Sequence, residues 1–250
     1  MIELYANISF GHENDWSVIE RRVISAAQCN ADAIVFNKSN PHVAIPEFKK
    51  YVSIPSKWGH LPYIEVAKNS EIDLENTYKL QALAKQIGIQ LIWSTTDMDS
   101  AAWIKENTEC DRIKIHYDSS TDINLVQYCL SNFNKLIYCG NDEDINTVLK
   151  YVPGQTAKQR ITLYHTTKKF PPQVEELNLG RINQLQSRPH VSVGYEGRSI
   201  DIFPDCAVVF KNVNYIEKYL GDDDSQGAIL SPQKFYDFFV NMNQLEIAND

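Results

Sequence analysis

Short apolar runs alternate with longer amphipathic stretches along almost the whole chain. The short runs have the length and bounding turn signals of buried strands. The longer stretches repeat apolar residues at intervals of three and four, which is typical of helices that pack by one face. We predict strands at 2–8, 33–36, 89–93, 112–116, 135–139, 160–164, 190–194 and 215–217. We predict helices at 15–29, 74–87, 98–107, 122–132, 142–151, 177–186 and 231–246.

Local signals mark several boundaries of these elements. Gly88 is a good C-terminal stop for its helix, and Ser231 followed by Pro232 is a typical helix start. Residues 38–70 contain several prolines together with Gly59, which predicts a long loop or excursion rather than a helix.

Eight strand–helix units in 250 residues predict a (β/α)8 TIM barrel, an α/β fold. We find no linker and no internal repeat, so one domain over residues 1–250 is expected, with the excursion at about 38–70. A doubly wound open sheet is the competing arrangement. It usually has a glycine-rich turn after its first strand, where this chain has only Gly11.

Composition excludes several classes of protein. Lys and Arg total 24 against 32 Asp and Glu, a net charge of −8, so nucleic acid is not an expected partner. No apolar run approaches the ~20 residues that span a bilayer, and the N-terminus has no signal-like pattern, so no membrane contact is expected. Five cysteines without metal-site or redox spacing predict free thiols and a cytoplasmic location.

Candidate chemistry lies where the predicted strands end, because active sites of barrels lie at that face. If the strand faces holding Lys114 and His165 point inward, a lysine and the histidines His116 and His165 converge there. Basic side chains would then bind a phosphate or carboxylate: Lys114, Lys168, Arg198 and Lys218. The alternative is that Lys168 is solvated and Lys218 is a strand-end residue without a ligand.

Two further possibilities stay open from the residues alone. His12, His116 and His165 together with Glu217 have the donor types of a metal site, although a lone strand-end histidine is more often hydrogen-bonded structure. Cys139 follows a strand as a nucleophile would, and the competing interpretation is a buried thiol.

Several segments, in order, resemble the motifs of the sialic acid synthase family. Residues 165–171 (HTTKKFP) resemble HCTSxYP, 194–199 (GYEGRS) resemble GYSDHT, and 216–219 (IEKY) resemble IEKH. Residues 31–37 (ADAIVFN) are similar to ADAVKFQ, and 112–115 (RIKI) to the start of FKIAS. The resemblance covers about residues 2–240 and also implies the barrel.

The family condenses phosphoenolpyruvate with an N-acyl hexosamine, using Mn²⁺ or Mg²⁺. The resemblance implies roles in catalysis for Lys114, His165, Glu217 and Lys218, with His165 as a metal ligand. It implies a site for a small anion, such as phosphoenolpyruvate, a sugar phosphate or a sugar acid, and also a homodimer. The residues expected to bind this ligand are Ser94, Lys114, Thr167, Lys168, Tyr195 and Arg198.

The chain departs from the family pattern at several functional positions. Asn7 replaces an acidic residue, Val35 a phosphate-binding lysine, and Tyr219 the last histidine of IEKH. Arg198 stands where a second metal-binding histidine is expected, and arginine cannot ligate a metal. Residues 224–229 (DSQGAI) have neither His nor Ser at the two positions where the family loop GPDHxxS has them. The antifreeze-like domain that typically follows the barrel is missing from this sequence.

Three interpretations therefore remain. The chain is a phosphoenolpyruvate-dependent sugar-acid synthase of surface-sugar biosynthesis with an altered pocket, or a non-catalytic binding or scaffold protein of the same pathway. The third is a metal-independent lyase or aldolase that uses Lys114 or Lys218 as an amine nucleophile. Family likeness predicts the fold better than the reaction.

Overall fold

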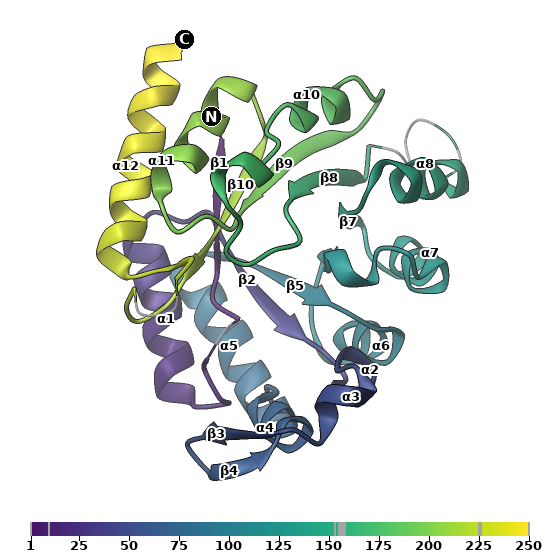
Figure 1. The fold of residues 1–250 in the computed structure, drawn as a ribbon, viewed down its shortest axis with the longest axis vertical. Helices are drawn as coiled ribbons and strands as arrows, with labels where there is room; N and C mark the ends of the chain where they lie inside the picture. The colour runs from purple at the N-terminus through teal and green to yellow at the C-terminus, as the bar shows by residue number, and fades with distance from the viewer. Residues whose placement is uncertain (1, 10, 153, 155–158, 225–226, 250) are drawn as a thin grey trace.

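Eight parallel strands close into a barrel surrounded by helices in the computed structural model (Figure 1). The structure describes residues 2–9, 11–152, 154, 159–224 and 227–249. Ser225 and Gln226, which belong to the loop compared with the family above, lie outside them. The prediction of a single-domain (β/α)8 barrel is confirmed.

Each strand of the barrel pairs in parallel with the next, and the last pairs with the first through Glu3 opposite Tyr215. A short strand, β11 (Ile229–Leu230), adds to the end of the last barrel strand. The barrel strands are β1 (Glu3–Asn7), β2 (Ala33–Lys38), β5 (Gln90–Thr95), β6 (Arg112–Ile115), β7 (Lys135–Cys139), β8 (Ile161–Thr166), β9 (Ser192–Gly197) and β10 (Tyr215–Leu220).

The connecting helices begin where the sequence offers side-chain caps. Asp15, Asp73, Asp97, Asp122 and Asn141 each accept hydrogen bonds from backbone N–H groups of the first turn. The helices are α1 (Trp16–Gln28), α5 (Leu74–Ile87), α6 (Met98–Asn107), α7 (Ile123–Asn132), α8 (Asp142–Tyr151), α10 (Arg181–Gln186), α11 (Ile202–Cys206) and α12 (Pro232–Asn249).

The excursion between β2 and α5 is more regular than the sequence suggested. It holds α2 (Pro41–Ala44), α3 (Glu47–Lys50), a hairpin of β3 (Ser53–Ser56) and β4 (Gly59–Pro62), and α4 (Tyr63–Ser70), so the expectation of no helix here was wrong. The prolines explain the error. Pro41 occupies the first position of its helix and Pro46 and Pro62 precede theirs, where a missing N–H costs nothing.

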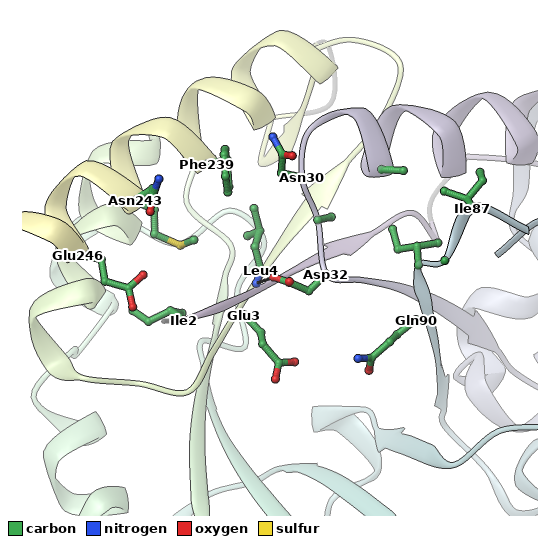
Figure 2. A pocket seen from close by; sticks show the side chains of 15 residues that line it. Ile2, Glu3, Leu4, Asn30, Asp32, Ile87, Gln90, Phe239, Asn243 and Glu246 are labelled. Carbon is green, nitrogen blue, oxygen red and sulfur yellow. Dashed lines mark hydrogen bonds between the residues drawn. The ribbon is translucent and has the colours of Figure 1, made fainter. Parts of the chain in front are cut away.

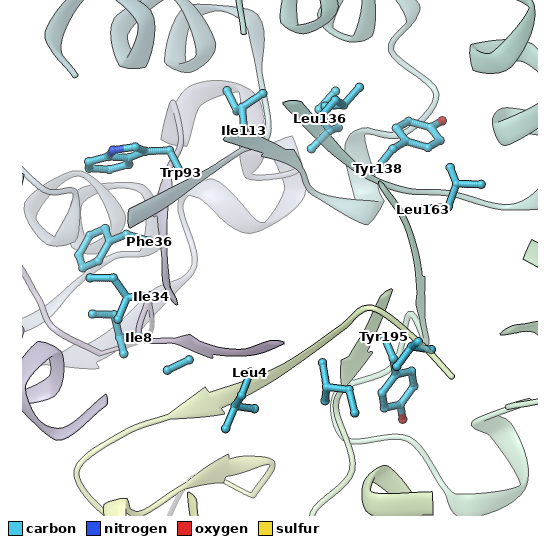
Figure 3. Packing of buried hydrophobic residues seen from close by; sticks show 14 of the residues in the cluster. Leu4, Ile8, Ile34, Phe36, Trp93, Ile113, Leu136, Tyr138, Leu163 and Tyr195 are labelled. Atoms are coloured by element: carbon cyan, nitrogen blue, oxygen red, sulfur yellow. The ribbon is translucent and has the colours of Figure 1, made fainter. Parts of the chain in front are cut away.

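Alternate residues of the strands face the two sides of the barrel wall. One set packs against the helices and forms the main core, including Leu4, Phe36, Trp93 and Leu163 (Figure 3). The other set fills the barrel interior, where Tyr5, Val35, Ile137 and Tyr164 form a separate apolar cluster. Both faces of these strands are buried, as is usual for parallel sheets.

Candidate functional site

A cavity of about 620 Å³ opens at the carboxyl ends of the strands. The excursion supplies one wall of this cavity, through Val43, Ala44 and Tyr63. The barrel and its loops contribute mainly neutral polar groups: Asn7, Ser9, Asn37, Ser39, Ser94, Thr96, His116, Ser119, Thr121 and Tyr219. Three charged side chains, Lys114, Asp118 and Asp122, also line it, and we call this cavity the mouth.

Lys114 is held by two carboxylates inside the barrel. Its Nζ lies 2.7 Å from Oε1 of Glu217 and 3.0 Å from Oε2 of Glu196, and all three side chains are at most 2% exposed. Asn7 donates a hydrogen bond of 2.8 Å from Nδ2 to the same Glu217 oxygen. Among the described residues, Oε2 of Glu217 is a buried oxygen without a hydrogen-bond partner.

Arg198 holds the second oxygen of Glu196. Its Nε and Nη2 lie 2.8 and 2.7 Å from Oε1, and the hydroxyl of Tyr219 donates to the same oxygen at 2.5 Å. We call these four ionisable side chains, Lys114, Glu196, Arg198 and Glu217, the barrel network. Two cations and two carboxylates bring its formal charge to zero.

The protonation states in the barrel network follow from burial and from these pairs. Burial opposes ionisation of Glu196, but Arg198 and then Lys114 more than offset it and hold its pKa below the usual range. Burial likewise opposes the charge on Lys114, and the two carboxylates outweigh it and raise the pKa of the ammonium. Burial raises the pKa of Glu217, which Lys114 only partly counters. Lys114 is therefore a charged ammonium at neutral pH.

His165 does not reach the barrel interior. It shares the outer face of β8 with Leu163, which packs in the main core, and its Nε2 lies 2.7 Å from the carbonyl oxygen of Leu177. Burial lowers the pKa of this imidazole. The expected meeting of His165 with Lys114 is therefore absent, because the face that contains it points toward the helices.

Lys218 and Tyr195 also lie on the outer side of the wall. Lys218 forms an ion pair with Asp205 of α11 and donates a hydrogen bond of 2.6 Å to the carbonyl oxygen of Ser199. The hydroxyl of Tyr195 donates to the other oxygen of Asp205 at 2.7 Å. We call Lys218, Asp205 and Tyr195 the wall cluster; it joins β9, β10 and α11 and does not meet the mouth.

The remaining predicted site residues are divided between the mouth and the surface. Ser94 lines the mouth and is buried beside Lys114 in the pairing of β5 with β6. Thr167 is half-buried after β8, and Lys168 is exposed, with its Nζ 4.0 Å from Asp118. The structure thus brings Ser94, Lys114, Arg198 and Glu217 into or beside the mouth and leaves His165, Lys168, Tyr195 and Lys218 outside it.

Comparison with known proteins identifies the chain's relatives. The model of the NeuB family matches residues 22–248, which is most of the chain. The chain belongs to the NeuB family. A curated relative, the N,N'-diacetyllegionaminic acid synthase of Legionella pneumophila, is 25% identical over 235 residues. That alignment covers 89% of this chain and 64% of the relative, so the chain spans less than two thirds of that relative's length.

A second sequence relative and a solved structure agree with this assignment. The enzyme of the same name from Campylobacter jejuni is 24% identical over 268 residues, covering 98% of this chain and 76% of that protein. The N-acetylneuraminic acid synthetase of Leptospira borgpetersenii, solved in complex with citrate, superposes with a TM-score of 0.86 at 18% identity. The superposition covers 99% of this chain and 84% of that one, and it supports the barrel fold.

The Mn²⁺ or Mg²⁺ that the resemblance implies does not fit the side chains of this NeuB-family barrel. His165 is directed away from the mouth, and Arg198 and Tyr219 stand where the family motifs have histidine. The two carboxylates of the barrel network are each bound by a cation of the chain, Glu196 by Lys114 and Arg198 and Glu217 by Lys114. Within the described parts of the chain, no group of three or more His, Cys, Asp or Glu residues could hold a metal.

The other nucleophile and metal candidates also have structural roles. Burial raises the pKa of Cys139 to about 12, so its thiol is not ionised at neutral pH. His12 accepts a hydrogen bond from the backbone N–H of Asn14 and packs against Phe36, with 4.7 Å between ring centroids. Burial lowers the pKa of His116, which lines the mouth as a neutral imidazole.

The sequence analysis assigned no role in the site to Glu196, Asn7 or Tyr219. Glu196 and Glu217 are opposite each other in the register of β9 with β10, so they face the same side of the wall. That signal is visible only once the pairing is known. The hydroxyl and amide groups of the mouth were missed because they lie on loops and strand ends with no motif of their own.

A second cavity, of about 710 Å³, lies at the opposite end of the barrel (Figure 2). It is bounded by the start of β1, the residue Asp32 before β2, the start of β5 and the last helix, α12. It contains none of the predicted site residues. No helix in the described residues is both long and apolar enough to cross a membrane.

Proposed function

We propose that this NeuB-family chain binds a small sugar of surface-carbohydrate biosynthesis in its mouth and does not condense it with phosphoenolpyruvate. The observation that carries the proposal is the barrel network. Lys114 and Arg198, the cations expected to hold the anionic donor, are each bound by a buried carboxylate of the chain itself.

The lining of the mouth supports an uncharged, hydroxyl-rich ligand, because Asp118 and Asp122 disfavour an anion and most of the other groups are neutral and polar. Amide and hydroxyl groups both donate and accept hydrogen bonds, which suits the hydroxyls of a sugar. Oδ1 of Asn37 is a buried acceptor without a partner among the described residues, and Asn37 lines this cavity. A sugar hydroxyl would supply the donor that this oxygen lacks. Tyr63 adds an aromatic surface at the excursion wall.

The lyase or aldolase alternative is less well supported. An amine nucleophile must lose its proton, and the carboxylates around Lys114 raise its pKa. Lys218 is bound to Asp205 behind the barrel wall, away from the mouth. Neither lysine offers a free amine to a substrate bound in the mouth.

Calorimetry with N-acetylmannosamine tests the proposal, and the protein with Thr96→Val in the mouth is the matched control. We expect saturable binding to the wild-type protein, weakened several-fold by loss of the hydroxyl. A parallel assay measures phosphate released from phosphoenolpyruvate and N-acetylmannosamine with Mn²⁺, and we expect none. Phosphate release would support the synthase instead. Failure to bind both N-acetylmannosamine and N-acetylglucosamine would refute a sugar-binding role.

The pathway, the cytoplasmic location and a homodimer belong to the same proposal. The synthases named among its relatives support a role in nonulosonic acid metabolism. All five cysteines are free thiols, which suits a reducing compartment. Size-exclusion chromatography with light scattering measures the oligomeric state, and a mass of one chain would refute the homodimer.

A further inference from the structure

The carboxylate of Glu196 has the surroundings of a bound anion. One oxygen accepts from Lys114, and the other accepts from two nitrogens of Arg198 and from the hydroxyl of Tyr219. An ammonium, a guanidinium fork and a hydroxyl are the groups with which proteins hold phosphate and carboxylate ligands. Here the anion is covalently part of the chain and is 1% exposed.

The position of Glu196 in the chain makes this arrangement specific. It is the third residue of GYEGRS, where the sialic acid synthase motif GYSDHT has serine. A serine side chain is shorter by two heavy-atom positions and carries no charge. At this position the chain has a carboxylate between two cations, where the family motif has a neutral hydroxyl group.

We propose that Glu196 is a specificity-determining residue. Its carboxylate occupies the position between Lys114 and Arg198 where an anionic ligand would bind, so the mouth selects uncharged ligands. The proposal rests on the mouth being the ligand site proposed above. The proposal also states that Lys114 and Arg198 still form an anion-binding site, which the side chain of Glu196 occupies. Removal of the carboxylate leaves the network with two cations and one carboxylate, a net charge of +1, which favours a phosphate or carboxylate ligand.

The space vacated by Glu196 would connect with the mouth. Lys114 and Tyr219 both touch Glu196 and both line the cavity. Shortening of the side chain to serine therefore opens a path from the cavity to the two cations. The isosteric change to glutamine removes the charge and keeps the shape, so the two variants separate charge from space.

The test measures binding of inorganic phosphate and of phosphoenolpyruvate to the wild-type protein and to Glu196→Ser, Glu196→Gln and Glu196→Asp. We expect the Ser variant to bind at least one of the two probes at least 10-fold more tightly than the wild-type, Asp and Gln proteins do, because glutamine and aspartate still fill the site. The binding should weaken as salt increases, and Lys114→Met added to Glu196→Ser should abolish it.

Thermal unfolding keeps the test decisive if the variants are unstable. Phosphate, compared with chloride at equal ionic strength, should raise the Tm of the Ser variant and not that of the Gln variant or the wild type. A folded Ser variant that binds neither probe would refute the proposal, as would wild-type protein that binds them equally well. Sugar binding is measured separately on the wild type, so its failure would overturn the proposed function and leave the anion-site result intact.

Discussion

Replacement of Lys114 by methionine should destabilise the protein, because methionine keeps the length of the side chain and removes its charge. Glu217 would then keep only Asn7 as a hydrogen-bond donor, whereas Glu196 would keep Arg198 and Tyr219. Loss of one partner from a buried ion pair costs about 3–5 kcal/mol. Because Asn7 and Arg198 remain, we expect about 3 kcal/mol, close to the lower end of that range.

The loss should appear in urea unfolding at pH 7.5, followed by far-UV circular dichroism. It corresponds to a fall in Tm of about 6–12 °C for a domain of this size. The double variant Lys114→Met/Glu217→Gln should recover part of the loss, because the carboxylate that lost its ammonium is then neutral.

The pH dependence provides the sharper test of this reasoning. Burial already raises the pKa of Glu217, and removal of Lys114 raises it further. An acid whose pKa is higher in the folded state binds more protons there than in the unfolded state, so its folded form loses stability as pH rises. The deficit of the variant should therefore shrink between pH 8 and pH 5. A deficit below about 1 kcal/mol, or one that is equal at both pH values, would refute the buried charge pair.

Three further changes probe features away from the barrel network. Lys218→Met should lower the free energy of unfolding by about 3–5 kcal/mol, because Asp205 loses its ion pair. Sugar titrations of the folded variant should match those of the wild type, and weaker sugar binding would show that Lys218 belongs to the ligand site. Gly197→Ala should lower the free energy of unfolding in urea by about 1–3 kcal/mol, since its Cβ would lie 2.6 Å from an oxygen of Asp205. An unchanged unfolding midpoint would show that the wall cluster shifts to accommodate the methyl group without loss of stability. Cys139 should react with a thiol reagent at pH 8 only after unfolding, as mass spectrometry of the labelled protein would show; rapid labelling of the native protein would contradict its burial.

The barrel could be predicted from the sequence because its signals are local. Helical periodicity, helix-end signals such as Gly88 and Ser231, and the regular spacing of apolar runs each act within a few residues. The excursion was predicted less well, because a proline marks a helix start as readily as a helix break. That ambiguity is resolved only by the packing of the short helices on one another.

The candidate site was less predictable, because both faces of the barrel strands are buried. In β8, Leu163 and His165 alternate with Tyr164 and Thr166, and either pair fits a buried face. The choice of inner face depends on closure of the barrel, a property of all eight strands together. Lys114 was predicted as a site residue and lies in the mouth, whereas Glu196 became visible as its partner only through closure of the barrel, across whose interior the two side chains meet.

The excursion wall of the mouth makes ligand preference and barrel integrity separable traits. Val43, Ala44 and Tyr63 face the cavity, yet the segments that hold them pack largely on one another, with α2 and α3 against α4 and α4 against its hairpin. Substitutions in this segment can reshape one side of the cavity without touching the strands that close the barrel. Substitutions confined to the excursion can therefore change which ligand binds during evolution, while the barrel strands stay under selection for stability alone.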